Sequence, residues 1–225
     1  IMKKKLLSLI LVLTVLTSLT LTACGGGADG GDADGGDGGD AAASLVVAME
    51  GEGLETFDPG NVYETYAGPV MTLCYENLFS FFGGDAAEPW LVDTYEFSED
   101  GKTLTCTLKD GITFASGNPL TSADVAFSLN RCKNLKGNPS FITDTIESIE
   151  TPDEKTVIFH LTEVDSAFIS KLTYKSCAIL DSVAAKEQGA TDAENAAEAD
   201  TARDYLDNNS LGSGQFVLTK YAPNE

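Results

Sequence analysis

Apolar and polar residues alternate in two pairs of short segments, which is the pattern of half-buried β-strands. The first pair is Thr94–Phe97 and Thr103–Leu108, separated by Ser98–Lys102 with its Asp-Gly step. The second pair is Ile146–Glu150 and Thr156–Leu161, separated by a short polar segment. Period-two alternation on both sides of a short turn predicts two β-hairpins.

A helical period replaces this alternation just before the first hairpin. Pro69 suits the first turn of a helix, where its missing N–H costs nothing. Behind it, positions recur at intervals of three to four residues, as expected for a stripe that faces a core. These positions are Val70, Leu73, Cys74, Asn77 and Leu78.

A second helix is predicted to begin at Thr121. The segment Thr121–Asp124 fits a capping box, in which the first and fourth residues satisfy each other's backbone N–H groups. The helix then continues through Arg131 with apolar positions at Val125, Phe127 and Leu129. Asp124 is therefore interpreted as a helix cap and not as a catalytic acid. Turns on either side of Ile112–Ala115 predict a short strand there.

Two further apolar segments lie near the ends of the folded sequence. Leu45–Met49 predicts a short strand, and Phe57–Gly60 predicts a turn. Near the other end, Phe216–Thr219 also has the composition of a strand. A strand needs a neighbour, and we expect its neighbour to come from later sequence.

The N-terminal segment has the layout of a bacterial export signal. Lys3–Lys5 precede an apolar run from Leu6 to Leu21, which is shorter than the roughly 18 to 20 apolar residues of a spanning helix. Residues 1–23 are therefore predicted to be a signal peptide. The sequence Leu-Thr-Ala-Cys at its end resembles the lipobox of bacterial lipoproteins, which implies that Cys24 carries the lipid anchor. Such a lipoprotein lies on the outer face of the cytoplasmic membrane.

The segment after Cys24 has no residue that could join a core. From Gly25 to Ala43 it is almost entirely Gly, Asp and Ala. Glycine makes a chain flexible and like charges extend it, so residues 24–44 are predicted to be a disordered tether.

The charge balance argues against one class of partner. The formal net charge is −21, and removal of residues 1–23, with three lysines and no acid, would move it to −24. Nucleic acids require a basic face, so no nucleic-acid partner is expected.

The remaining candidates for chemistry are few. The cysteines beyond Cys24 form no C-x-x-C pair, and His160 is the single histidine, so neither a zinc site nor another metal site is expected. The cysteines are Cys74, Cys106, Cys132 and Cys177. Cys74 and Cys106 are expected to be buried thiols, whereas Cys132 and Cys177 are the better candidates for a disulfide. His160 lies in a predicted strand without a nucleophile elbow, which argues against a hydrolase.

Eight segments together resemble one known family. In chain order they are Asp58-Pro59, Tyr75–Phe79, Pro89–Leu91, Ser98–Thr105, Leu108–Phe114, Gly117–Ser128, Lys155–Leu161 and Gly212–Phe216. Their order and spacing resemble the family 5 extracellular solute-binding proteins, the oligopeptide, dipeptide and nickel receptors of ATP-driven importers. The likeness extends from Leu45 to about Leu218. The family often has Gly-Thr-Gly-Pro-Tyr where this chain has Gly212–Phe216.

The resemblance implies an α/β fold of the periplasmic-binding-protein type II class. Its ligand cleft lies between two lobes, and an extra subdomain is inserted in lobe I. Residues 45–80 and 173–225 would form the main part of lobe I, and residues 81–172 the inserted subdomain. Because family chains continue far beyond the equivalent of Glu225, we expect that only the N-terminal part is present here.

The function implied is binding without catalysis. The protein would capture oligopeptides outside the cell and deliver them to ABC permease subunits, as a monomer without a cofactor. A nickel chelate or another solute is an alternative ligand, and an adhesin or chaperone lipoprotein is an alternative role.

The resemblance also indicates where the ligand would bind. In the family, the loop before the first helix brings side chains to the cleft, and here that loop is Tyr63, Glu64, Thr65 and Tyr66. The two tyrosines offer flat apolar surface with polar tips, which suits a peptide. Glu64 is expected to face a cationic group.

Overall fold

The computed structural model describes residues 54–222. The signal segment, Cys24, the tether and the predicted strand Leu45–Met49 lie outside the described residues. Within residues 54–222, no helix is long and apolar enough to cross a membrane.

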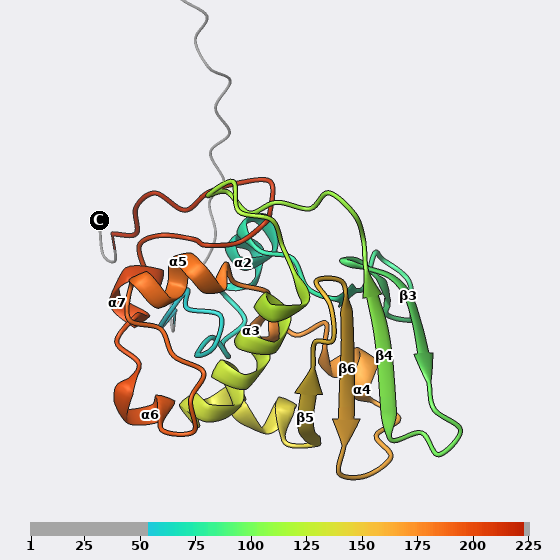
Figure 1. Cartoon of the computed structure of the whole chain (residues 1–225). Coiled ribbons are helices and arrows are strands. Elements are labelled where there is room, and N and C mark those ends of the chain that lie inside the picture. The colour runs from blue at the N-terminus through green and yellow to red at the C-terminus, as the bar shows by residue number, and fades with distance from the viewer. Residues whose placement is uncertain (1–53, 223–225) are drawn as a thin grey trace, which may run out of the picture. The chain divides into compact units, whose positions relative to one another are not determined.

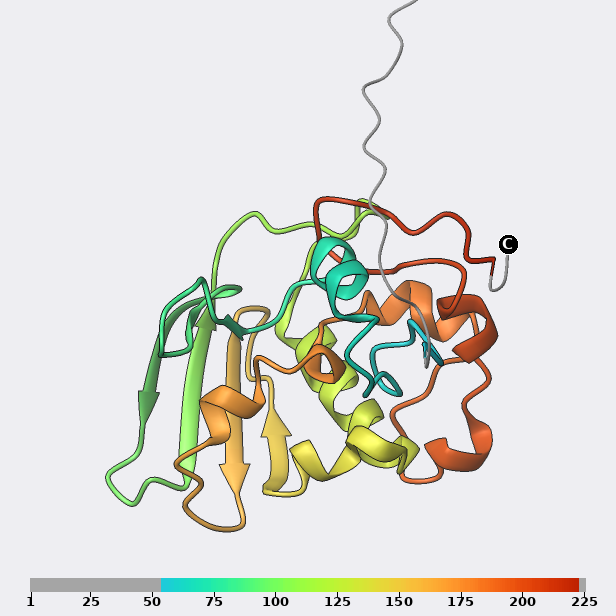
Figure 2. The same ribbon diagram turned by 180° about the vertical axis from the view of Figure 1, so that it is seen from behind.

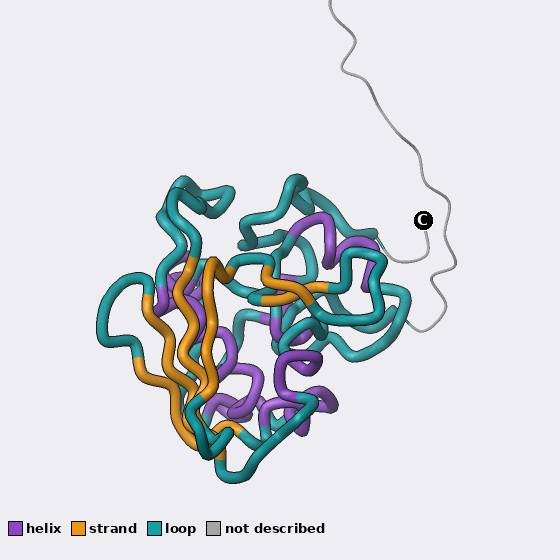
Figure 3. Tube along the Cα trace, turned by 90° about the vertical axis from the view of Figure 1, so that its right-hand side faces the viewer, coloured by secondary structure: helices purple, strands orange, loops and turns teal. Residues whose placement is uncertain are grey.

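A four-stranded antiparallel sheet forms one side of the described region (Figure 3). Its strands are β3 (Val92–Phe97), β4 (Thr103–Leu108), β5 (Ile146–Glu150) and β6 (Thr156–Leu161), and the spatial order is β3-β4-β6-β5. Both predicted hairpins are confirmed. The second has the predicted bounds, and the first begins two residues earlier, at Val92.

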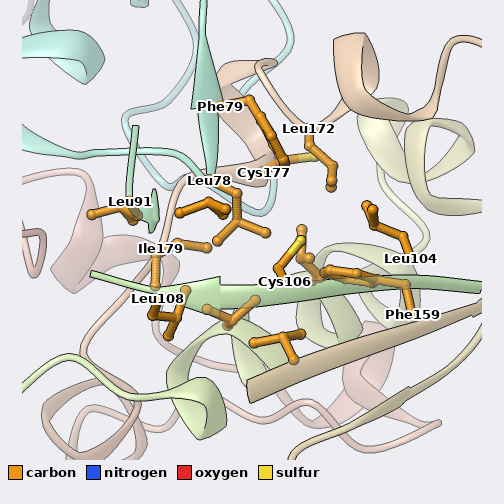
Figure 4. Close-up of a cluster of buried hydrophobic side chains, with 14 of the residues drawn as sticks. Leu78, Phe79, Leu91, Leu104, Cys106, Leu108, Phe159, Leu172, Cys177 and Ile179 are labelled. Atoms are coloured by element: carbon orange, nitrogen blue, oxygen red, sulfur yellow. The ribbon is translucent and has the colours of Figure 1, made fainter. Parts of the chain in front are cut away.

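The alternation in β4 and β6 decides which face of the sheet is buried. Leu104 lies opposite Phe159, and Cys106 lies opposite Val157, so four apolar side chains meet on one face. These side chains are fully buried, whereas the intervening threonines of β4 are partly exposed. Figure 4 shows the labelled core side chains of both strands pointing toward those of neighbouring segments. Burial of this face removes apolar area from water and holds the sheet against the helices.

Helix α3 (Ser122–Leu135) packs against this face. Its N-cap is Thr121, as predicted. The Asp124 carboxylate accepts from the backbone N–H and the hydroxyl of Thr121, each at 2.8 Å. Its other oxygen accepts from the backbone N–H of Ser182 at 2.9 Å. The cap therefore also fixes α5 (Ser182–Glu187), a contact between segments 58 residues apart.

Helix α2 (Gly68–Cys74) is shorter than its pattern predicted. It ends before Asn77 and Leu78, which are buried in the following extended segment. Met71 and Cys74 form its buried stripe, while Leu73 is 47% exposed. The predicted stripe is thus wrong at Leu73, because this short helix buries the face of Met71 and Cys74 and leaves Leu73 outside that face.

The second core lies on the opposite side of α3 from the sheet and is built from short helices and loops (Figure 1). It contains the apolar residues of segment 57–75 and of segment 178–206, together with Phe127 from α3. The helices of the second segment are α5, α6 (Ala196–Ala199) and α7 (Arg203–Leu206). The remaining elements are β1 (Phe79–Ser80), β2 (Glu88–Pro89), α4 (Phe168–Lys171) and the 3-10 helices η1 (Asn138–Thr143) and η2 (Lys175–Cys177). The proposed limits of an inserted subdomain, 81 and 172, stay a prediction.

One predicted strand is wrong, and a second has no partner strand among the described residues. Ile112–Ala115 forms a single bridge, Thr113 to Pro119, since the two turns leave room for no longer ladder. Phe216–Thr219 is extended but belongs to no strand of the described residues. Its backbone N–H groups form other hydrogen bonds. The N–H of Phe216 donates to the carbonyl of Leu73, and the N–H of Leu218 donates to the hydroxyl of Ser210.

The four cysteines of the described region are buried free thiols. This confirms the interpretation of Cys74 and Cys106. The disulfide considered for Cys132 and Cys177 is not formed. Burial raises the pKa of Cys132 to about 12, and burial followed by the charge of Cys132 raises the pKa of Cys177, so both behave as core side chains.

Candidate functional site

The loop that precedes α2 is organised by Asp58. Its backbone carbonyl accepts from the N–H groups of Asn61 and Val62, which closes the predicted turn. Its side chain accepts from the backbone N–H of Gly60 at 3.2 Å and from the amide of Asn61 at 2.7 Å. Asp58 therefore stabilises the loop through hydrogen bonds within the loop itself.

The same carboxylate is held from behind by Arg131 of α3. Arg131 is 0% exposed and makes two hydrogen bonds to Asp58, at 2.6 and 2.9 Å. It makes two more to Asp200, at 2.7 and 2.9 Å. Asp200 in turn accepts from the backbone N–H groups of Thr191 and Ala202. One guanidinium thus joins the loop, α3 and the segment that leads into α7. Figure 2 shows the backbone of these segments from behind.

Hydrogen bonds within this cluster keep Arg131 and Asp200 charged. Burial disfavours the charge of Arg131, but hydrogen bonds to Asp58 and Asp200 outweigh it and raise its pKa. Burial opposes the charge of Asp200 as well, but Arg131 and two backbone N–H groups hold the pKa of its carboxyl below the usual range. Paired and hydrogen-bonded charges are the form in which ions are tolerated inside proteins.

Gly60 is required by the close approach of this cluster. A Cβ at position 60 would lie 2.6 Å from Cδ1 of Leu135 and 2.8 Å from Nη1 of Arg131. A side chain there would have to displace the end of Leu135 and the Arg131 guanidinium, which four hydrogen bonds hold in place. The small residue after Asp58-Pro59 is therefore a packing requirement of the loop.

Tyr63, at the far end of this loop, is the predicted site residue that reaches an open cavity. It is 44% exposed and its ring lies edge-on to Phe141, with centroids 5.9 Å apart. The ring of Tyr174 lies 6.0 Å away on another side, and its hydroxyl donates to the backbone carbonyl of Tyr63 at 2.8 Å. Three aromatic residues from distant segments therefore meet at one place.

These aromatic residues line a cavity of about 310 Å³. Its other walls come from η1 and α4, and its residues are Tyr63, Phe141, Ile142, Ala167, Ser170, Lys171 and Tyr174. The walls are largely apolar, with the amine of Lys171 held at 2.6 Å by Asp165. An apolar concavity with a few polar groups at its rim is typical of a site for a small ligand.

Glu64 is turned inward. One carboxylate oxygen accepts from the backbone N–H groups of Glu55 and Thr56, and the other accepts from the N–H of Tyr63. The Glu64 charge acts on Lys175: burial lowers the pKa of the Lys175 amine, and the charge of Glu64 opposes that shift. Glu64 therefore supports the loop and lies within electrostatic range of a lysine. That Glu64 faces a cationic group of a ligand stays a prediction.

Thr65 and Tyr66 contribute less than predicted to this cavity. Thr65 is exposed and Tyr66 is half-buried. Neither residue lines the cavity, and within residues 54–222 neither side chain makes a hydrogen bond. The loop thus offers one residue, Tyr63, to the aromatic cavity, and the assignment of Thr65 and Tyr66 to a site stays a prediction.

Sequence reasoning missed Phe141, Tyr174 and Lys175. They lie 78 or more positions from Tyr63 in the chain, so no local spacing joins them. The available signal was weak: Phe141 follows Pro139-Ser140, and Tyr174 and Lys175 lie shortly after α4. Burial first, and then the charges of Tyr63 and Glu64, raise the pKa of Tyr174, so its hydroxyl is a hydrogen-bond donor at neutral pH.

Features of a metal centre or of hydrolytic chemistry are not assembled in the part that the structure describes. Residues 54–222 contain no group of three His, Cys, Asp or Glu side chains placed to hold a metal ion. His160 lies on β6, and its Nε2 is 3.0 Å from an oxygen of Glu150 on β5. This is an exposed pair on the sheet and not part of the aromatic cavity.

Comparison with known proteins shows which family this chain is similar to. Residues 86–225 match the family described as "Bacterial extracellular solute-binding proteins, family 5 Middle". A curated relative is the probable D,D-dipeptide-binding periplasmic protein DdpA of Escherichia coli. It is 29% identical over 172 residues, which is 74% of this chain and 32% of DdpA.

Two solved structures share the fold. NikZ of Campylobacter jejuni, in complex with Ni(L-His), has a TM-score of 0.62 at 19% identity, over 76% of this chain and 32% of NikZ. DppA of Helicobacter pylori, in complex with the peptide STSA, has a TM-score of 0.59 at 21% identity, over 76% of this chain and 35% of DppA. The chain spans about a third of the length of the curated relative it matches.

Proposed function

The chain belongs to the family 5 bacterial extracellular solute-binding proteins, and from that premise we propose that it captures oligopeptides outside the cell for an ABC importer. The peptide would be handed to permease subunits in the cytoplasmic membrane. No chemical step on the ligand is part of this proposal, since the task is capture and release.

The observation that carries the proposal is the aromatic cavity of Tyr63, Phe141 and Tyr174. Aromatic rings offer rigid apolar area to side chains of varied shape, and tyrosine hydroxyl groups can meet peptide N–H and C=O groups. Tyr63 and Tyr174 would contact the ligand directly. Glu64 would keep Tyr63 in place through its bond to the Tyr63 N–H.

Two further hollows are lined in part by residues of α2. The smaller, of about 50 Å³, is lined in part by Thr72, Thr173 and Lys175, and the last two flank Tyr174 in the chain. The larger, of about 380 Å³, shares Thr72, Ser80 and Trp90 with the smaller. Hollows that follow one another along a surface suit an extended chain better than a compact solute, which favours a peptide.

Calorimetric titration of the full-length protein with di- to pentapeptides tests the proposal. We expect saturable binding, and we expect Tyr63→Ala to weaken it by about ten- to a hundredfold, because burial of an aromatic side chain is worth about 1.5–3 kcal/mol. Tyr95→Ala is the matched control, since Tyr95 is similarly exposed, at 42%, but lies on β3. Saturable binding that Tyr63→Ala and Tyr95→Ala leave equally intact would move the site away from this cavity.

A nickel chelate is the second candidate ligand, and the fold shared with NikZ favours it. The same titration distinguishes the two candidates when Ni²⁺ with L-histidine replaces the peptides. Binding of the chelate without binding of any peptide would replace the oligopeptide assignment.

We also propose that the protein is a lipoprotein anchored through Cys24, which keeps the receptor beside its permease. Two or more acyl chains hold a protein stably at a bilayer. Cys24→Ser should therefore move the protein from the membrane fraction to the soluble fraction or the medium. Membrane retention of that variant would contradict the anchor.

A further inference from the structure

The hollow of about 380 Å³ differs in chemistry from the cavity at Tyr63. It is bounded by α2, by the segment after β1 and by the glycine-rich loop near residue 214. The residues that matter here are Leu73, Glu76, Phe81, Phe82, Trp90 and Gly214. It therefore combines three aromatic side chains with one carboxylate.

The aromatic walls are set at a steep angle to each other. The rings of Phe82 and Trp90 have centroids 5.6 Å apart and an interplanar angle of 71°. Phe81 and Phe82 are both exposed. The face of an aromatic ring attracts a cation, and tryptophan attracts it most strongly.

Glu76 supplies the charge that such a cation would need. One of its oxygens accepts from the hydroxyl of Ser213 at 2.7 Å, which fixes the carboxylate at the wall of the hollow. Among residues 54–222, no lysine, arginine or histidine forms a salt bridge with it. An apolar ligand would remove water from the Glu76 carboxylate and offer no hydrogen bond in return, which is unfavourable. A cationic ligand would remove the same water but form an ion pair with the carboxylate.

The wall behind Glu76 is rigid. The N–H of Gly214 donates to the carbonyl of Cys74 at 3.1 Å, and the N–H of Phe216 donates to that of Leu73 at 3.0 Å. A Cβ at position 214 would lie 2.4 Å from backbone atoms of Cys74 and Leu73. The glycine-rich loop is therefore pressed onto the end of α2 and holds Ser213 beside Glu76.

We propose that this hollow is a subsite for a basic side chain of the bound peptide, arginine or lysine. The inference rests on the proposed function and deepens it. The guanidinium or ammonium group pairs with Glu76 and lies against Trp90 and Phe82, while the rest of the peptide extends past Thr72 toward Tyr63. The strongly negative net charge of the chain, −21, favours the approach of such ligands.

The test compares arginine with citrulline, its neutral analogue of nearly equal shape. Pentapeptides of alanine with one arginine at each position in turn, and the same set with citrulline, are titrated into the full-length protein. In the best register we expect arginine to bind about tenfold more tightly than citrulline. Glu76→Gln should abolish that difference, and Trp90→Leu should reduce it.

The matched control is Glu99→Gln, which removes the same charge from an exposed turn of the sheet and should keep the difference. Equal affinity of arginine and citrulline peptides for the unmodified protein, in every register, would overturn the subsite and leave oligopeptide binding intact. Binding of no peptide at all would overturn the proposed function and the subsite with it. Because the first comparison uses the unmodified protein, it decides the matter even if Glu76→Gln folds poorly.

Discussion

The two cores on either side of α3 are held together by different forces. The sheet side is held by apolar side chains that local alternation directs to one face, such as Leu104 opposite Phe159. The side that carries the site loop depends on one buried cation, Arg131, and on the two carboxylates that surround it. Apolar burial is distributed over many contacts, so its loss is graded. A buried charge cluster works as a unit, because each member left without its partner is strongly disfavoured.

Removal of the Arg131 charge should have the largest effect on stability of the variants considered. Arg131→Met keeps much of the side-chain volume but leaves Asp58 and Asp200 buried without a cation. We expect a loss of about 3–5 kcal/mol in the free energy of unfolding. Urea denaturation measures it. Lys155→Met is the control: it breaks an exposed pair with Asp110, which should matter little. Similar losses for both variants would refute the special role of Arg131.

A cavity in the sheet core should cost somewhat less. Leu104→Ala removes a fully buried side chain from β4, with an expected loss of about 2–4 kcal/mol. Thr105→Ala, one position further on the opposite face, should stay within about 0.5 kcal/mol. Thermal and urea unfolding of the pair measure the contrast. Equal losses would mean that the register of β4 differs from the one described here.

A smaller effect is expected at the start of α3, where the two cores meet. Thr121→Ala removes the hydroxyl that donates to Asp124 and should cost about 1 kcal/mol through loss of a helix cap. Peptide affinity should stay nearly unchanged, because Thr121 lies away from the Tyr63 cavity. A large loss of affinity at unchanged stability would show that a binding residue has been interpreted as a cap.

The smallest effect we expect is a change in acid sensitivity. Arg131 and backbone N–H groups, against the effect of burial, hold the pKa of Asp200 below the usual value of about 3.9. A carboxyl with a depressed folded-state pKa contributes stability that is full above about pH 5 and is lost as pH falls toward the folded value. Asp200→Asn should therefore lose less stability between pH 5 and pH 3 than the unmodified protein does. Parallel pH profiles of the urea midpoints would argue against this linkage.

Local sequence determined the hairpins and the start of α3. Alternation places Leu104, Cys106 and Leu108 on one face whatever surrounds the sheet, and Thr121 with Asp124 satisfies the first turn of the helix from within four residues. The family resemblance likewise rests on ordered local motifs, and the match over residues 86–225 confirms it. These features could be predicted because the atoms that decide them are close together in the chain.

Tertiary structure alone decided where α2 ends, why Phe216–Thr219 is no strand and what the site contains. The cavity joins Tyr63, Phe141 and Tyr174, and the cluster behind it joins Asp58, Arg131 and Asp200. A buried charge or an open aromatic face has its meaning only through partners that may come from anywhere in the chain, and a sequence read locally contains no record of those partners. Tyr63 was predicted from its loop, but its neighbours Phe141 and Tyr174 became visible only in the fold.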